Sequence, residues 1–209
     1  MRRILITFLF ATISLLAQPV SIGVKGGVPI TDAFHTIQGD EASYVTNTKR
    51  YLVGPTGEVH LPLGFSIEVD ALYKRLGYQY QAFPTTGTVS AQTVANSWEF
   101  PLLVKWAFPG GPIRPFVDAG ASFRHISGVH QFQEIFGAGS SSTNNPVEFH
   151  KSTDQGLVFG GGIEFKFGRL RISPELRYTR WGGENFRDPV QALLRTNRNQ
   201  GDFLLGITF

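Results

Sequence analysis

The chain has 209 residues, of which 42% are hydrophobic and 17% charged, and its formal net charge is +3. It contains no Cys, so disulfides and thiolate metal sites are excluded. Two of the positive charges, Arg2 and Arg3, lie in a segment that we expect to be removed, which leaves the mature chain close to neutral. No nucleic-acid partner is expected, because such a partner requires a concentrated basic face.

Residues 1–17 have the pattern of a secretory signal peptide. Arg2 and Arg3 supply the positive beginning, and residues 4–16 form an apolar run that is too short for a membrane-spanning helix. Cleavage after Ala17 is the expected position. The predicted domain organisation is therefore a signal peptide, 1–17, followed by one domain, 18–209.

The rest of the chain contains segments in which apolar and polar residues alternate, as in strands with one apolar face. These segments are 21–28, 49–61, 65–74, 97–106, 114–124, 157–167, 170–178 and 201–209. Long connections at 29–48, 81–95, 126–153 and 182–199 alternate with short turns at 62–64, 109–112 and 168–169. Strict alternation of long and short connections is typical of bacterial outer-membrane β-barrels, which have long extracellular loops and short periplasmic turns.

Aromatic residues recur at a fixed spacing on the apolar faces. Phe65 and Tyr73 are eight residues apart in one segment, and Trp98 and Trp106 are eight apart in the next. Leu170 repeats this spacing with a tyrosine at position 178. Eight residues at a rise of about 3.3 Å and a tilt of ~40° span roughly 20 Å, close to the apolar band of such barrels. The spacing predicts two interfacial aromatic girdles and disfavours the alternative fold, a secreted β-sandwich.

The opposite, polar faces carry nearly balanced acids and bases. These are Glu58, Glu68, Asp70, Lys74, Glu99, Lys105, Arg114, Asp118, Arg124, Glu164, Lys166, Arg171, Glu175, Arg177 and Asp202. Neighbouring carboxylates such as Glu68 and Asp70 would suit acid–base catalysis. However, eight strands enclose a space just wide enough for side chains, and charges confined there require partners. The expected role is a mixed-sign network of interior ion pairs.

The last segment ends with Phe203, Leu205, Ile207 and Phe209 on one face. It resembles the C-terminal strand of outer-membrane barrels, whose terminal Phe is an assembly signal. Residues 72–75, 98–105 and 114–120 resemble strands of the outer-membrane β-barrel domain family, which is similar to the transmembrane domain of outer-membrane protein A and to the opacity proteins. The resemblance implies an all-β, eight-stranded antiparallel up-and-down transmembrane barrel in the outer membrane. It also implies the barrel assembly machinery as a partner of Phe209.

A structural or loop-mediated surface role without catalysis is the leading functional prediction. The long connections would face outward and bind a surface partner. Arg180, Arg187, Arg195 and Arg198 would pair with phosphates of lipopolysaccharide, which with outer-membrane lipid is the expected partner. We expect a monomer without cofactor or metal site, since the His residues lack metal-ligand spacing.

Two alternative functions remain. The His-x-Ser step at His125 and Ser127 resembles that of outer-membrane lipid A deacylases, in which Ser attacks an ester and His acts as its base. Glu134 would orient His125, although we expect it to lie in a mobile loop, and Gly128 replaces the Asn usual after the Ser. The other alternative is a narrow pore for small solutes, which a crowded interior disfavours.

Overall fold

The structure is a computed structural model that describes residues 20–36, 39, 42–82, 88–137, 139–188 and 193–209. The predicted signal peptide, 1–17, lies outside the described residues. The strands are β1 (Val20–Pro29), β2 (Phe34–Thr36), β3 (Ala42–Thr46), β4 (Leu52–His60), β5 (Phe65–Asp70), β6 (Leu72–Ala82), β7 (Val89–Ala107), β8 (Ile113–Ile135), β9 (Gly139–Thr143), β10 (Thr153–Phe167), β11 (Leu170–Trp181), β12 (Leu194–Thr196) and β13 (Asn199–Thr208). No helix in this part of the chain is long and apolar enough to cross a membrane.

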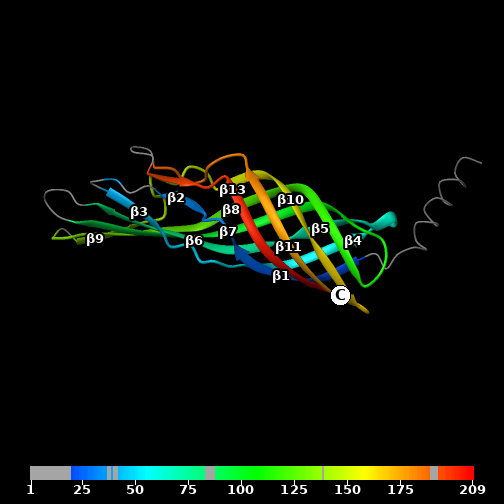
Figure 1. Cartoon of the computed structure of the whole chain (residues 1–209). Helices are drawn as coiled ribbons and strands as arrows, with labels where there is room; N and C mark the ends of the chain where they lie inside the picture. Colours follow the sequence, from blue (N-terminus) through cyan, green and yellow to red (C-terminus); the bar gives the residue numbers. More distant parts are fainter. Residues whose placement is uncertain (1–19, 37–38, 40–41, 83–87, 138, 189–192) are drawn as a thin grey trace, which may run out of the picture.

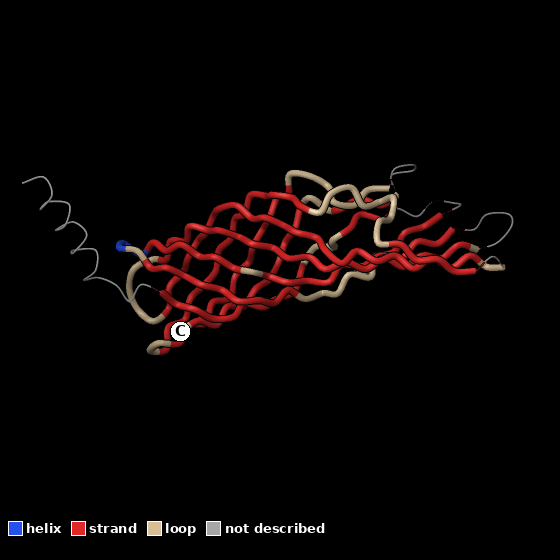
Figure 2. Tube along the Cα trace, turned by 180° about the vertical axis from the view of Figure 1, so that it is seen from behind, coloured by secondary structure: helices blue, strands red, loops and turns tan. Residues whose placement is uncertain are grey.

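Eight antiparallel strands close into a barrel, as the sequence predicts (Figures 1 and 2). Their order is β1, β4, β5 with β6, β7, β8, β10, β11 and β13. β5 and β6 are two parts of one barrel strand, interrupted at Ala71, and both pair with β4 and β7. The pairing of β1 with β13 closes the circle. At Gly23 and Gly27 of this seam a Cβ would lie 2.0 Å from backbone oxygens of β13, so the close approach requires Gly.

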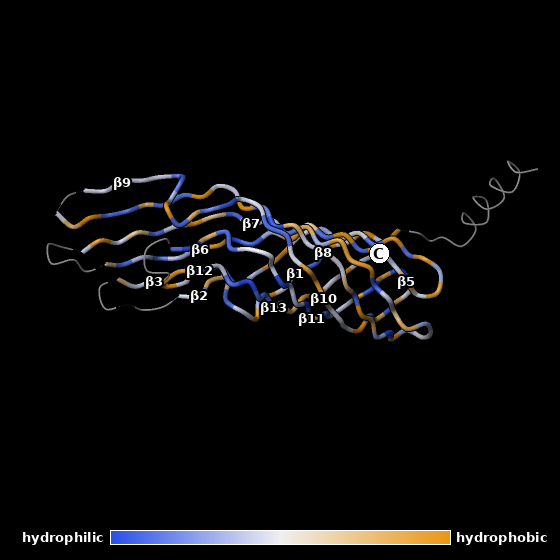
Figure 3. The backbone as a smooth tube through the Cα atoms, turned by 90° about the horizontal axis from the view of Figure 1, so that it is seen from above, coloured by the Kyte–Doolittle hydropathy of each residue, from blue (hydrophilic) through white to orange (hydrophobic). Residues whose placement is uncertain are grey.

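The outward faces carry the apolar residues, which alternate with polar ones along the strands (Figure 3). Two aromatic clusters mark the ends of the apolar band. In one, the ring of Tyr73 lies 5.2 Å from Trp98 and 6.4 Å from Tyr51. In the other, the ring of Trp106 lies 6.4 Å from Phe65, near the short turns. The predicted aromatic banding is therefore confirmed on these strands.

Strand length is where the sequence-based prediction is wrong. The predicted connection 81–95 is mostly strand, because β6 extends to Ala82 and β7 begins at Val89. The predicted connection 126–153 contains the end of β8 and all of β9. These extensions project as a long ribbon (Figure 1) beyond the cluster of Tyr51, Tyr73 and Trp98, which we call the outer aromatic cluster. Their inward residues include small ones such as Ala91 and Ala95, which make the period-two pattern weak.

The barrel interior holds the predicted charges, almost all of them buried. Lys25, which the sequence analysis did not include, lies at the centre of this network. Its Nζ atom contacts Glu68, lies 2.9 Å from Glu175 and lies 3.5 Å from Asp70. Arg177 contacts the same three carboxylates at 2.5–3.0 Å. We call the interior ion pairs of this layer and its neighbours the ion-pair plug.

Further layers of the ion-pair plug lie on either side. Toward the short turns, Lys105 lies 3.3 Å from Glu58 and 3.7 Å from Glu164. Toward the long connections, Lys74 lies 2.6 Å from Glu99. Acids and bases thus alternate through the depth of the barrel, which confirms the predicted network of mixed sign.

Replacing Lys25 tests the ion-pair plug. In Lys25→Met, three buried carboxylates lose a shared cation, and breaking a buried pair from one side costs about 3–5 kcal/mol. We expect a clearly lower midpoint of urea unfolding, measured in detergent by the heat-modifiable gel shift. The matched control is Lys49→Met, because Lys49 is exposed and surface changes cost less than about 0.5 kcal/mol. Equal midpoints for both variants would contradict the central role of Lys25.

Removing Phe209 tests the closing seam. Its backbone exchanges two hydrogen bonds with Ile22, at 3.0 and 3.1 Å, and its side chain is exposed on the apolar face. We expect both deletion of Phe209 and Phe209→Ala to lower the amount of folded protein in the outer membrane. If the deletion alone lowers it, the lost backbone bonds explain the effect and the side chain is not an assembly signal.

Candidate functional site

The outer ends of β6, β7 and β8 carry a folded unit rather than plain loops. We call this unit the outer platform: these strand ends, β2, β3, β9, β12 and the described parts of 136–152 and 182–198. Strands β2 and β12 pair with each other, although about 160 residues separate them in the chain. The platform has its own hydrophobic core. That core contains Phe34, Ala42, Tyr44, Leu76, Tyr78, Ala95, Ile126, Val129, Phe186, Leu193 and Leu194.

Aromatic rings join the segments of this core. The ring of Phe34 lies 5.4 Å from Tyr78 and 5.7 Å from Phe186, both edge-on. Phe149 lies 5.1 Å from Phe186, and the two residues also form an isolated β-bridge. The connections 126–153 and 182–199 are therefore fixed to each other, and the ring contacts of Phe34 and Phe186 with Tyr78 fix them to β6. The sequence analysis did not predict this packing, because these connections are mostly polar and only a few aromatic residues in them form the core.

Tyr44 anchors the platform to a buried carboxylate. Its hydroxyl donates to Oε1 of Glu148 at 3.2 Å, and both side chains are buried. Burial, followed by the negative charge of Glu148, holds the pKa of Tyr44 well above its usual range, and the same two causes raise the pKa of Tyr78. Both phenols therefore remain neutral at physiological pH.

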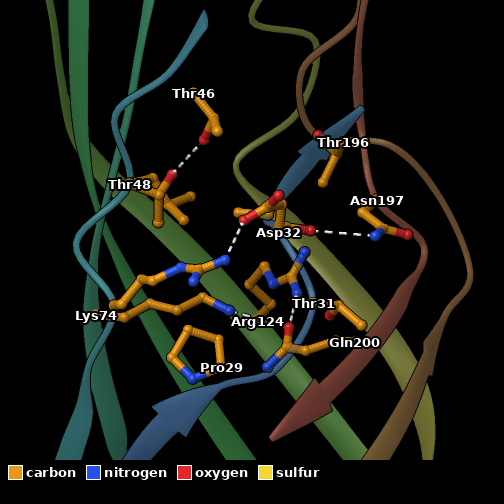
Figure 4. A pocket seen from close by; sticks show the side chains of 13 residues that line it. Pro29, Thr31, Asp32, Thr46, Thr48, Lys74, Arg124, Thr196, Asn197 and Gln200 are labelled. Atoms are coloured by element: carbon orange, nitrogen blue, oxygen red, sulfur yellow. Dashed lines mark hydrogen bonds and ion pairs between the residues drawn. The ribbon is translucent and has the colours of Figure 1, made fainter. Parts of the chain in front are cut away.

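A pocket of about 310 Å³ lies between the platform and the ion-pair plug (Figure 4). Its lining comes from both ends of the chain and from the middle. The lining residues are Pro29, Thr31, Asp32, Ala33, Thr46, Thr48, Arg50, Lys74, Leu76, Arg124, Thr196, Asn197 and Gln200. Three of these are cations and one is an acid, so the pocket has a basic lining.

The floor of the pocket is organised by Gln200. Its side-chain oxygen accepts from Arg124 at 2.6 Å, from Lys74 at 2.9 Å and from the indole of Trp181 at 3.0 Å. Its side-chain nitrogen donates to Glu99 and to a second carboxylate, Asp202. The amide thus bridges two cations, which line the pocket, and two acids, which do not. The guanidinium of Arg124 also stacks 3.7 Å from the ring of Trp181.

The mouth of the pocket carries one exposed ion pair. Arg50 donates to Asp32 at 2.9 Å, and the amide of Asn197 donates to the backbone oxygen of Asp32 at 3.1 Å (Figure 4). Both charged side chains are more than half exposed. An exposed pair of this kind contributes little to stability, so these groups are free to exchange partners.

The four predicted arginines in or beside the last connection are all exposed but differ in their contacts. Arg180 donates to Asn199, and Arg198 donates to the backbone oxygen of Gly182 at 2.9 Å. Arg187 and Arg195 lie directly opposite each other in a β-bridge. Among the described residues neither of these two has an ion-pair partner, so two like charges face each other in water.

The residues of the deacylase alternative do not assemble. His125 is exposed on β8 opposite Trp98, and Ser127 lies two residues further along on the same side. Glu134 belongs to β8 and not to a loop, which corrects the sequence-based expectation. Nine residues separate it from His125 along one strand, or about 30 Å. Gly128, at a φ of +57°, marks the irregularity where β8 shifts register against β7.

Two residues that organise the pocket and plug, Gln200 and Lys25, were missed by the sequence analysis. Gln200 lies two residues from the inward Asp202, and Lys25 lies four residues from the inward Ser21. The period-two alternation of the strands alone would therefore have placed both of them inside the barrel. This alternation does not indicate which inward residues meet across the barrel, because that depends on the register between strands.

Several solved structures are similar to this chain. Outer membrane protein OprG from Pseudomonas aeruginosa is 12% identical, with 91% of this chain and 94% of that chain covered and a TM-score of 0.49. Outer membrane protein W from E. coli is 13% identical, with 91% and 96% covered and a TM-score of 0.44. The N-terminal barrel domain of OprF from Pseudomonas aeruginosa is 12% identical, with 90% and 96% covered and a TM-score of 0.43.

No curated protein matches the chain. A family model does match, over residues 16–182, and its description is outer membrane protein beta-barrel domain. That match covers most of the sequence, including the barrel strands from β1 to β11. The chain therefore belongs to the outer-membrane protein β-barrel domain family and is a protein of the outer membrane.

Proposed function

We propose that this protein is a closed, non-catalytic barrel that holds the outer platform at the cell surface as a binding unit. The observation that carries the proposal is the contrast between the two halves of the molecule. The membrane part is filled by buried ion pairs, while the part beyond it has its own hydrophobic core and exposed charged groups. Binding residues commonly lie on such connections, positioned by a rigid scaffold.

The proposed partner is lipopolysaccharide, recognised through its phosphates. Arg187 and Arg195 lie opposite each other, and neither has an ion-pair partner among the described residues. Like charges directly opposite in a sheet are destabilising. A phosphate between them would relieve that repulsion and accept paired hydrogen bonds from each guanidinium. Arg180 is held to Asn199 and Arg198 to backbone oxygens, so these two arginines have a smaller role in the proposal.

Catalysis by His125 and Ser127 is not part of the proposal. A Ser nucleophile requires a base held by a third group within hydrogen-bond reach, and Glu134 lies too far along β8 to serve. A pore is not part of it either, because charged side chains that are buried and paired occupy the barrel interior.

The closed interior predicts the absence of conductance. Purified protein in planar bilayers should give no steady current above the leak, because an eight-stranded barrel has room only for its own side chains. A porin from the same membrane, reconstituted in parallel, controls for insertion. A stable current of porin size would contradict the closed barrel.

Arg187 and Arg195 should govern affinity for lipopolysaccharide. The double variant Arg187→Gln/Arg195→Gln should weaken binding about tenfold or more, since each charge-assisted hydrogen bond contributes roughly 1.5–3 kcal/mol. Binding of fluorescent lipopolysaccharide to protein in detergent is the measurement, and Arg169→Gln, in a short turn at the opposite end, is the matched control. Dephosphorylated lipopolysaccharide should not distinguish the parent from the double variant. If the double variant also loses affinity for dephosphorylated lipopolysaccharide, and as strongly as for the intact molecule, phosphate is not what these arginines recognise.

A further inference from the structure

We infer that the pocket beneath the outer platform is a binding site for a small sugar-like molecule that carries one carboxylate or phosphate group. The inference is independent of the lipopolysaccharide proposal, because neither Arg187 nor Arg195 lines this pocket. It assigns the anionic group to the floor, at Lys74 and Arg124, and the hydroxyl-bearing body to the walls.

Several donors converge on one acceptor at the floor. Three donors, from Lys74, Arg124 and Trp181, converge on the side-chain oxygen of Gln200, which has two lone pairs. The Nε atom of Arg124 is buried and is occupied by an ion-pair contact with Oε1 of Glu99 at 3.4 Å. The contacts of Lys74 and Arg124 with Gln200 and Glu99 use only part of their three ammonium and five guanidinium hydrogens, so this floor favours a ligand that brings acceptor oxygens. Carboxylate and phosphate groups supply two or three of them with a charge of the right sign.

The acids nearest to these cations are turned away from the pocket. Glu99 lies 2.6 Å from Lys74 and 3.4 Å from Arg124, and it accepts from the amide nitrogen of Gln200 at 3.0 Å. Asp202 accepts from the same nitrogen at 2.8 Å. Neither acid lines the pocket. The charges of the floor are therefore balanced from below while the cationic groups face the open space above (Figure 4).

The walls combine apolar surface with a few polar groups, as the C–H faces and the hydroxyl groups of a sugar ring require. Thr46 contributes a hydroxyl and Asn197 an amide, while the hydroxyls of Thr48 and Thr196 also line the pocket but already bond to backbone groups of the platform. Most of the exposed lining is apolar, and Pro29, Ala33 and Leu76 contribute to it. A volume of about 310 Å³ lies at the lower end of the range for ligand pockets. These features fit a monosaccharide-sized acid, either free in solution or as part of a phosphorylated surface glycan.

Trp181 provides a direct reporter of the floor. The chain has three Trp residues, and the other two, Trp98 and Trp106, belong to the outward aromatic clusters. In a Trp98→Phe/Trp106→Phe background, emission therefore comes from Trp181. We would titrate folded protein in detergent with glucose 6-phosphate and with gluconate, using glucose as the neutral probe. The expected result is a saturable change in emission with the two anions and none with glucose.

Two further substitutions separate binding from folding. Glu99→Gln removes an acid that competes for the cations, so it should tighten anion binding several-fold, an effect that misfolding cannot produce. Lys74→Gln/Glu99→Gln removes both members of one ion pair, which avoids an unpaired buried charge, and should weaken binding at least tenfold relative to Glu99→Gln. Arg169→Gln is the charge-matched control and should bind as the parent does.

The source of the ligand is decided by competition. Displacement of glucose 6-phosphate from the Arg187→Gln/Arg195→Gln variant by lipopolysaccharide would identify a surface glycan as the occupant. Lack of displacement would identify a free sugar acid or sugar phosphate. The inference is overturned if neither anion changes the emission of Trp181 saturably, if glucose acts equally well, or if Lys74→Gln/Glu99→Gln binds as tightly as Glu99→Gln.

Discussion

The interaction on which the rest of the structure depends is the pairing of buried charges across the barrel. A closed circle of eight strands leaves its inward side chains in a space without bulk water, where an unpaired charge costs several kcal/mol. Lys25 on β1 meets Glu68 of β5 and Glu175 of β11, which lie 43 and 150 residues away in the chain. Such contacts cross the interior and join strands that are not neighbours in the sheet. They fill the interior and favour one register of the strands, while the pairing of β1 with β13 closes the circle.

The same constraint explains why so much of the fold was predictable from sequence. Within the membrane, every strand must place apolar residues outward and paired polar ones inward. Exposed apolar residues such as Phe65 and Ile67 therefore identify the outward face, and the residues between them identify the inward one. Beyond the outer aromatic cluster this requirement ends. There β7 and β8 continue through residues such as Ala91 and Gln92, whose pattern is weak because one side faces water and the other a small core. The predicted strand ends fail at this boundary.

The pocket was not predictable for a different reason. Its floor joins Lys74, Arg124 and Gln200, which come from β6, β8 and β13. Alternation places all three inside the barrel, but their meeting at one depth depends on the stagger between strands, which no local pattern encodes. The exposed pair of Arg50 and Asp32 depends further on the packing of the platform. Sequence alone therefore identifies the polar interior but not the hollow at its outer end.

The ion-pair plug and the pocket share residues. The contacts that fill the barrel interior are therefore connected to the proposed binding of an anion in the pocket. Lys74 and Arg124 satisfy Glu99 below and line the pocket above. Gln200 divides the two regions, because its oxygen faces the cations while its nitrogen faces the acids. An anion on the floor would draw the cations outward and weaken their hold on Glu99, so its affinity is limited by the ion pairs that it must share. The ion pairs that fill the barrel would therefore also limit how strongly the proposed pocket binds an anion.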